Sequence, residues 1–181
     1  HPGAHLRTGR EGGIERIAEL TRKVFERTPE VATRLLFETT AGMGSTIGER
    51  FEDLAEILKK IDWPERAGGG LDTCHMFAAG YDIRDADSYE KTMKEFGRLV
   101  GFKNLKAVHL NESKHPLGSR KDRHEHIGQG EIGAEAFRLL MRDKRFAKIP
   151  MSLETDKDDD LTEDRMNMEV LRRLAQQEEP A

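Results

Sequence analysis

Four short apolar segments alternate along this chain with longer amphipathic stretches, and each apolar segment runs into a carboxylate or an imidazole. The apolar segments are residues 33–37, a weaker stretch ending at Leu71, residues 105–110 and residues 149–153. In the longer stretches, apolar side chains recur every three or four residues, which is typical of helices with one buried face. Those stretches are residues 11–27, 47–61, 89–100, 137–141 and 166–174. Short buried strands that alternate with helices predict a parallel sheet and an α/β fold.

Residues that bind metal ions in other proteins stand at the ends of these predicted strands. They are Glu38, Asp72, His109 and Glu154, and together with His1 they recur at intervals of 34 to 45 residues. An interval of this size fits one strand followed by one helix, and in a (β/α)8 barrel the ends of all the strands meet on one face. Buried carboxylates need a partner, and a cation is the simplest partner for several of them at once. The pattern therefore predicts a metal site on that face.

Two further groupings enlarge the predicted site. His75 follows Asp72 by three residues, and Asp122 and His124 stand two apart in a long polar loop, residues 111–133. Side chains two residues apart in an extended segment project to the same side. Imidazoles and carboxylates suit zinc, and also manganese or iron. Eight such side chains exceed the needs of one tetrahedral zinc, which favours a multi-metal site of the kind that hydrolyses phosphoesters.

Composition limits the partners and the compartment of the chain. Its 181 residues include 30 Lys and Arg against 34 Asp and Glu, so the formal net charge is −4. This charge does not exclude a nucleic-acid partner, because the field at the site is local. No apolar run approaches the roughly 18 residues of a membrane span, so we expect no membrane partner. A single cysteine, Cys74, cannot form an internal disulfide and favours a reducing compartment.

Other polar residues carry weaker signals. We expect His5, His115 and His126 to be solvated or supporting residues, and Cys74 to be a small buried residue, not a nucleophile. Residues 39–44 resemble a phosphate-binding glycine loop but lack the lysine of a P-loop. Basic side chains in the long loop are as consistent with phosphate contact as with a solvated face. These basic residues are Lys114, Arg120, Lys121 and Arg123.

Two longer blocks of sequence resemble the signatures of the endonuclease IV family of AP endonucleases. The first is His109-Leu-Asn-Glu-Ser-Lys114 followed by Leu117-Gly-Ser-Arg-Lys-Asp-Arg-His124, and the second is Leu71-Asp-Thr-Cys-His75 followed by Ala78-Ala-Gly-Tyr-Asp82. Residues 1–6, 38–44 and 153–155 match further blocks of the family in the same order, so the resemblance covers nearly the whole chain. It departs from the family at residues 68–70, three glycines where bulkier strand residues are usual.

The resemblance implies a (β/α)8 TIM barrel of which this chain holds the C-terminal half or slightly more, from the end of strand 4 to helix 8. Residues 1–176 would form this single portion and residues 177–181 a frayed tail. A complete barrel typically has about 250 residues. We therefore expect the first strands, and one further histidine ligand, to lie upstream of His1, where the chain begins without Met or a signal-peptide pattern.

The resemblance also implies three zinc ions, with manganese as the alternative metal. The implied ligands are His1 and Glu38 for the first ion, Glu38, Asp72, His109 and Glu154 for the second, and His75, Asp122 and His124 for the third. Glu38 and Glu154 are the implied catalytic carboxylates, with Glu154 orienting or deprotonating the attacking water. We expect Lys114, Arg120 and Arg123 to contact DNA phosphates.

The implied activity is that of a zinc-dependent deoxyribonuclease of base excision repair. Such an enzyme hydrolyses the phosphodiester 5′ to an abasic site, leaving a 3′-hydroxyl and a 5′-deoxyribose phosphate, and removes groups that block 3′ ends. The expected partner is double-stranded DNA with abasic or 3′-blocked sites. The intact protein is expected to be a monomer inside the cell, in the cytoplasm or nucleoid, or in the nucleus or mitochondrion of a eukaryote.

Two other interpretations remain open at this point. A divalent-metal sugar isomerase or epimerase of a related barrel type shares the carboxylates and histidines at strand ends, but it does not explain the Asp122 and His124 pair or its basic surroundings. The other interpretation is an inactive metal- or DNA-binding fragment, because one ligand and part of the barrel would be missing. An open half barrel exposes sheet edges, so such a fragment would aggregate or pair with a copy of itself.

Overall fold

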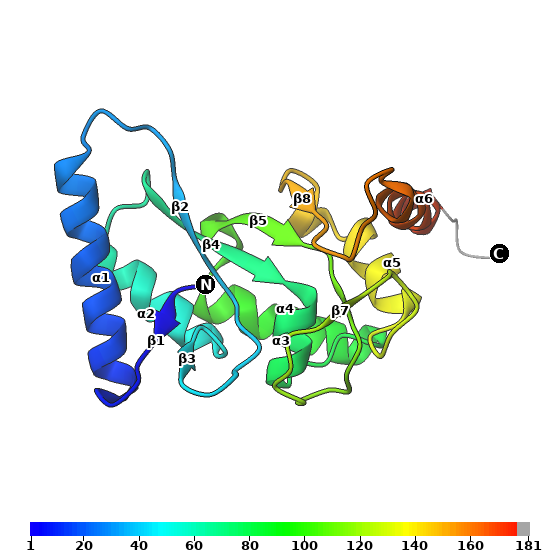
Figure 1. Ribbon diagram of the computed structural model, residues 1–181, viewed down its shortest axis with the longest axis horizontal. Helices are drawn as coiled ribbons and strands as arrows, with labels where there is room; N and C mark the ends of the chain where they lie inside the picture. The colour runs from blue at the N-terminus through cyan, green and yellow to red at the C-terminus, as the bar shows by residue number, and fades with distance from the viewer. Residues whose placement is uncertain (177–181) are drawn as a thin grey trace.

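A four-stranded parallel sheet forms the centre of the computed structural model, which describes residues 1–176 (Figure 1). Its strands are β2 (Leu35–Glu38), β4 (Ala67–Asp72), β5 (Leu105–His109) and β8 (Met151–Ser152), neighbouring one another in that order. A strand order that follows the chain, with a helix after each strand, is the topology of a TIM barrel. The predicted α/β barrel fold is therefore confirmed, with four of its eight strands in the described residues. The tail predicted at residues 177–181 lies outside them.

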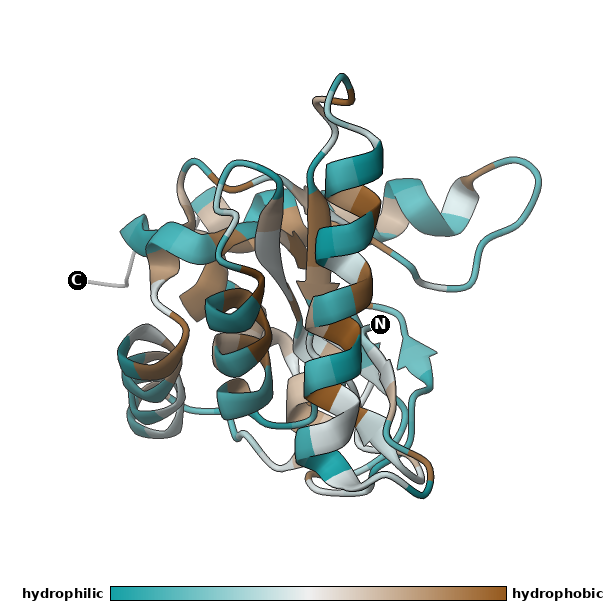
Figure 2. Cartoon of the chain, turned by 90° about the vertical axis from the view of Figure 1, so that its left-hand side faces the viewer, coloured by the Kyte–Doolittle hydropathy of each residue, from teal (hydrophilic) through white to brown (hydrophobic). Residues whose placement is uncertain are grey.

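Amphipathic helices follow the strands, and Figure 2 shows the apolar stripes that run along them. They are α1 (Gly9–Arg27), α2 (Phe51–Ile61), α4 (Ala86–Leu99), α5 (Ala134–Arg142) and α6 (Thr162–Gln176). Short 3-10 helices, η1 (Phe102–Asn104) and η2 (Lys144–Phe146), come before β5 and β8. Within residues 1–176, every helix is too short or too polar to cross a bilayer.

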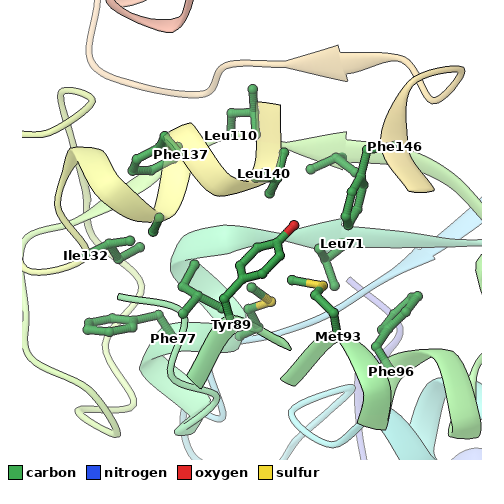
Figure 3. Close-up of a cluster of buried hydrophobic side chains, with 14 of the residues drawn as sticks. Leu71, Phe77, Tyr89, Met93, Phe96, Leu110, Ile132, Phe137, Leu140 and Phe146 are labelled. Carbon is green, nitrogen blue, oxygen red and sulfur yellow. The ribbon is translucent and has the colours of Figure 1, made fainter. Parts of the chain in front are cut away.

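Two clusters of buried apolar side chains hold these layers together. In the larger one, Leu71 on β4 packs with Met93 and Phe96 of α4 and with Phe137 and Leu140 of α5 (Figure 3). The smaller one lies mainly between α1, α2 and β2. Each large apolar side chain contributes about 1.5–3 kcal/mol when it is fully buried. Burial of these two clusters therefore stabilises the sheet, and with it the position of the strand ends that carry the predicted ligands.

Helix α2 begins four residues later than its apolar spacing predicts. Ile47 belongs to the two-residue strand β3 (Thr46–Ile47), and Gly48 has a φ of +105°, which a right-handed helix does not allow. The N–H of Gly48 donates instead to the Asp53 carboxylate at 3.0 Å. The expectation of a helix over residues 47–61 is therefore wrong in its first turn.

The three glycines of β4 weaken the sequence prediction, yet this strand is fully buried at the centre of the sheet. A Cβ atom on Gly68 would lie 2.6 Å from Cγ of Lys106 and 3.0 Å from a methyl group of Leu36. The register with β5 also shifts between Gly69 and Gly70. Glycine is favoured where neighbouring chains approach closely and where a strand carries a bulge, so crowding explains Gly68, and Gly69 and Gly70 lie at the shift of register.

One short helix and two antiparallel pairs of strands have no sequence pattern that predicts them. Helix α3 (Thr73–Ala79) follows β4 directly, and its first six residues are all buried, so it has no polar face to create a helical period. The antiparallel pairs are β1 (Gly3–Ala4) with β3, and β6 (Glu112–Ser113) with β7 (His124–Glu125). Strands of two residues are too short to show alternation.

Candidate metal centre

The carboxyl ends of the parallel strands bring four of the predicted ligands together. Strands β2, β4 and β5 end at Glu38, Asp72 and His109, and Glu154 lies two residues beyond β8. The register places Asp72 beside His109. One ligand atom from each of the four side chains lies within 4.8 Å of those of the others. We call Glu38, Asp72, His109 and Glu154 the strand-end group.

His109 stands between the carboxylates of the strand-end group. Its Nδ1 atom lies 2.7 Å from Oε1 of Glu38, 3.2 Å from Oε2 of Glu154 and 3.8 Å from Oδ2 of Asp72. Glu154 has the most exposed side chain of the three acids, at 48%, against 15% for Glu38 and 0% for Asp72. Among these acids, Glu154 is therefore the one that solvent and a substrate reach most easily.

Asp72 has two structural roles at once. Its Oδ1 accepts the N–H of His75 at 2.8 Å and so caps the start of α3, while its Oδ2 faces His109. An aspartate at a strand end is most often a helix cap, and here the second oxygen remains available to the site. Complete burial raises the pKa of Asp72 by disfavouring its charged form.

A second group lies beside the first and comes from α3 and the long loop. Nε2 of His75 is 3.1 Å from Oδ1 of Asp122, and Nε2 of His124 is 3.3 Å from the same oxygen. Nδ1 of His124 also contacts the backbone oxygen of Glu154 at 2.9 Å. We call His75, Asp122 and His124 the loop group. Asp122 and His124, two residues apart, thus point to the same side of the loop, as their spacing predicts.

Two nitrogen atoms of the loop group lack the partners that buried polar atoms need. Nε2 of His75 and Nε2 of His124 are both buried without a hydrogen bond, although both point toward the Asp122 carboxylate. A buried unpaired polar atom costs roughly 1–3 kcal/mol. Two imidazole nitrogens and one carboxylate oxygen around one point match the ligand chemistry of zinc. The residues present therefore fit a bound metal ion.

The charges of the two groups shift one another's pKa values. Burial alone would raise the pKa of Glu38, but hydrogen bonds from His109 and His75 outweigh burial and lower it to about 2. Burial alone would lower the pKa of His75, but Asp122 and Glu38 raise it to about 11. The imidazoles of His124 and His75, facing the Asp122 carboxylate, lower the pKa of Asp122. Strongly shifted pKa values in one cluster are typical of functional sites.

His1 reaches the edge of this cluster. Its Nε2 lies 3.8 Å from Oε2 of Glu38, and its ring meets that of His75 edge to face with the centroids 4.9 Å apart. Ligand atoms of His1, Glu38 and His75 form a further group within 4.8 Å. The strand end predicted at His1 is not seen in the parallel sheet, since residues Gly3–Ala4 pair antiparallel with β3.

Two buried polar residues organise the site and were not singled out by the sequence pattern. Asn111 is 0% exposed and contacts both Asp72 and the backbone of Glu154. Glu112 is also 0% exposed and accepts four backbone N–H groups of the long loop. Burial raises the pKa of Glu112. Their position in the sequence is the signal that could have found them. Both closely follow the strand-end ligand His109, inside the block His109–Lys114.

The residues with weaker signals lie around the cluster. Cys74 is fully buried, and burial raises the pKa of its thiol to about 12, so it is an inert residue at neutral pH. His126 contacts the amide of Asn167 through Nδ1 at 3.1 Å, and Nδ1 of His5 is buried without a hydrogen bond. His115 is half-buried in the long loop. His5, His115 and His126 are absent from the groups of clustered ligand atoms found within residues 1–176.

The predicted phosphate-contacting residues have different neighbours. Lys114 lies 3.3 Å from the Asp156 carboxylate, and Arg120 lies 3.9 Å from that of Glu49. The Arg123 guanidinium donates to the backbone oxygen of Asp122 at 2.6 Å. All three side chains are exposed. They belong to the long loop that carries Asp122 and His124, and their role in DNA contact stays a prediction.

A repeat of strands and helices that delivers carboxylates and imidazoles to one edge places the chain in the class of TIM-barrel proteins. More particularly, the chain belongs to the family described as Xylose isomerase-like TIM barrel, whose family model matches residues 1–175.

Relatives and solved structures narrow this placement. The chain is 52% identical over 174 residues to a probable endonuclease 4 of Chloroflexus aggregans, covering 96% of this chain and 61% of the relative. It is 49% identical to a probable endonuclease 4 of Geobacter sulfurreducens, covering 96% and 59%. It superposes on the crystal structure of endonuclease IV from Thermus thermophilus with a TM-score of 0.76 and 35% identity, covering 89% and 57%. The predicted resemblance to the endonuclease IV family is confirmed, and the chain spans about three fifths of its curated relatives.

Proposed function

We propose that this chain carries most of the catalytic centre of a metal-dependent AP endonuclease. The proposed reaction is hydrolysis of the phosphodiester 5′ to an abasic site in duplex DNA, with removal of blocking groups from 3′ ends as a second activity. One observation carries the proposal: eight carboxylate and imidazole side chains meet in overlapping clusters at the carboxyl ends of parallel strands. The relatives named probable endonuclease 4 support the same substrate class.

The proposed metal ligands are the residues of the strand-end group, the residues of the loop group and His1. Zinc is the proposed ion, with manganese as the alternative. When bound, such ions act as Lewis acids on the phosphate and bring the pKa of water to about 7. His75 and His124 would hold their metal through the Nε2 atoms that lack hydrogen-bond partners.

Glu154 is the proposed proton acceptor. It is the most solvent-exposed carboxylate of the strand-end group, and its backbone N–H is fixed by a hydrogen bond to Asn111 at 2.8 Å. A water molecule would give one proton to the Glu154 carboxylate while its oxygen forms a bond to phosphorus. The bond between phosphorus and the 3′ oxygen breaks, and that oxygen takes a proton from solvent, which leaves a 3′-hydroxyl and a 5′-deoxyribose phosphate. Glu38, already anionic because of its low pKa, would remain unprotonated and orient the water.

The basic side chains of the long loop are the proposed contacts to the DNA backbone. Lys114, Arg120 and Arg123 are exposed near the loop group, where they would bind phosphates flanking the lesion. The abasic nucleotide has to leave the helical stack before its phosphate reaches side chains at a recessed site. We expect the protein to act as a monomer on DNA inside the cell.

The test is incision of a duplex oligonucleotide that contains one tetrahydrofuran abasic analogue, with zinc supplied. We expect Glu154→Gln to lose incision by at least about a hundredfold, since a positioned base contributes roughly 10²–10⁴, while duplex binding in a mobility-shift assay stays close to that of the parent. Incision by Glu154→Gln at the parent rate would remove the assignment. Turnover of aldoses, with no incision of the duplex by the parent protein, would favour the isomerase interpretation instead.

A further inference from the structure

We propose that Asn111 is a positioning residue that fixes Asp72 and Glu154 relative to each other. Asp72 ends β4 and Glu154 lies two residues beyond β8, and these strands are not neighbours, because β5 lies between them. The sheet register therefore does not set their separation directly. This inference rests on the metal centre proposed above.

The side-chain amide of Asn111 spans the gap across β5. Its Nδ2 donates to Oδ2 of Asp72 at 2.6 Å, and its Oδ1 accepts the backbone N–H of Glu154 at 2.8 Å. The amide has one possible orientation, because a flip would set an oxygen against a carboxylate and an NH₂ against an N–H. Asn111 is also fully buried, so water does not compete for either bond.

Asn111 is itself held in place by α3. Its backbone N–H donates to Oγ1 of Thr73 at 2.8 Å, and the Thr73 hydroxyl donates to the backbone oxygen of Asn111 at 2.7 Å. Thr73 directly follows Asp72, so one side of the network is tied to the residue that it orients. A rigid support of this kind lowers the reorganisation that metal binding would otherwise require.

The oxygen that Asn111 holds lies next to both groups. Oδ2 of Asp72 is 3.8 Å from Nδ1 of His109 in the strand-end group. It is also 3.8 Å from Nδ1 of His75 and 4.0 Å from Nε2 of His124 in the loop group. With Oδ1 already committed to the cap of α3, the hydrogen bond from Asn111 leaves this carboxylate no freedom to rotate. Loss of Asn111 should therefore loosen the metal ligands without removing any of them.

The test measures zinc affinity in the purified protein without DNA, by competition with a chromophoric chelator. We expect Asn111→Ala to lower zinc affinity about 10- to 100-fold, the range found when supporting partners of metal ligands are removed. Asn104→Ala is the matched control, because Asn104 lies at the opposite end of β5 and its amide donates to the backbone oxygen of Val100 at 2.6 Å. Asn104→Ala should keep the zinc affinity of the parent.

Further outcomes separate this inference from the proposed function. Thr73→Val keeps the side-chain volume and removes the hydrogen bonds to the Asn111 backbone, so it should weaken zinc binding in the same direction and by less. If Asn111→Ala does not fold, parent-like zinc affinity in Thr73→Val overturns the inference. Zinc affinity within about twofold of the parent in Asn111→Ala also overturns it, since the expected loss is at least about tenfold. If the parent binds no zinc, the proposed metal centre itself is wrong, and this inference is wrong with it.

Discussion

The strand-end group and the loop group lie side by side but are held by different parts of the fold. Glu38, Asp72 and His109 are the last residues of hydrogen-bonded parallel strands. Asp122 and His124 lie in a loop whose only pairing of strands within the described residues is the two-residue contact of β6 with β7. The strand-end group thus takes its geometry from the sheet, whereas the loop group needs supports of its own.

Glu112 supplies much of that support. Its Oε1 accepts the N–H groups of Ser113 and Ile132 at 2.9 and 2.8 Å, and its Oε2 accepts those of Gly128 and Gly133 at 3.1 and 3.0 Å. One buried carboxylate thus gathers both ends of the loop around the segment that carries Asp122 and His124. Two neighbouring sites can therefore differ in robustness, and local changes to the loop should damage the loop group and spare the strand-end group.

Glu112→Ala should separate the two groups most strongly. Removing this carboxylate takes the acceptor from four backbone N–H groups, of which those of Ser113 and Ile132 are buried, and we expect the free energy of unfolding to fall by about 3–5 kcal/mol. The protein should lose the zinc of the loop group and keep zinc at the strand-end group, as counted by metal analysis after gel filtration. Glu125→Ala is the control, because Glu125 is half-buried in the same loop and accepts the N–H of His126. Equal zinc loss from both groups in Glu112→Ala would contradict this difference in support.

Substitution of one glycine in the loop and one in the sheet should show the same difference between the two supports. A Cβ atom on Gly130 in the loop would lie 2.3 Å from the backbone oxygen of Ser113 and 2.7 Å from Cγ of Glu112. Gly130→Ala should therefore cost about 1–3 kcal/mol and weaken the loop group. A Cβ atom on Gly70 of β4 would meet Glu38 at 3.5 Å or more, which is ordinary contact. Gly70→Ala should change stability by less than about 1 kcal/mol. Thermal melting of both variants checks this, and a larger loss in Gly70→Ala would reverse the expected order.

Stabilisation of the protein by zinc should depend on pH through the histidine ligands. The pKa values of His75, His109 and His124 are all raised, that of His75 to about 11. Without metal, the protonated form of His75 stabilises the fold fully below about pH 6.5, and this contribution is lost as the pH rises toward 11. Zinc needs neutral imidazoles, so the gain in melting temperature on adding zinc should grow as the pH rises through this window.

The loop group should release its zinc first on acidification, because it uses two imidazoles whereas the strand-end group uses one. Metal analysis of samples dialysed at a series of pH values would show two steps of release. His75→Ala should abolish the step at the higher pH and leave the other in place. Release of all the zinc in one step, unchanged by that substitution, would contradict the assignment of two groups.

The sequence predicts the strand-end group better than its supports for a physical reason. Apolar runs that end in Glu38, Asp72 and His109 specify both the strands and the edge at which their ends meet, because parallel strands in a βα repeat point the same way. Asn111 and Glu112 are polar, and polar residues are mostly exposed. Only the folded loop shows that its backbone N–H groups need a buried acceptor. Gly68 of β4 likewise makes sense only once its close contacts with Leu36 of β2 and Lys106 of β5 are seen.

The boundaries of the local elements depend on similar details. Helix α3 lacks a polar face, so its sequence has no amphipathic period, and the late start of α2 depends on the backbone conformation of Gly48.

Anomalous X-ray diffraction at the zinc absorption edge, from crystals of the zinc-loaded protein, would show directly whether both groups bind zinc. We expect one anomalous peak among Glu38, Asp72, His109 and Glu154, and another among His75, Asp122 and His124. Peaks confined to surface residues elsewhere, with neither group occupied, would contradict this expectation.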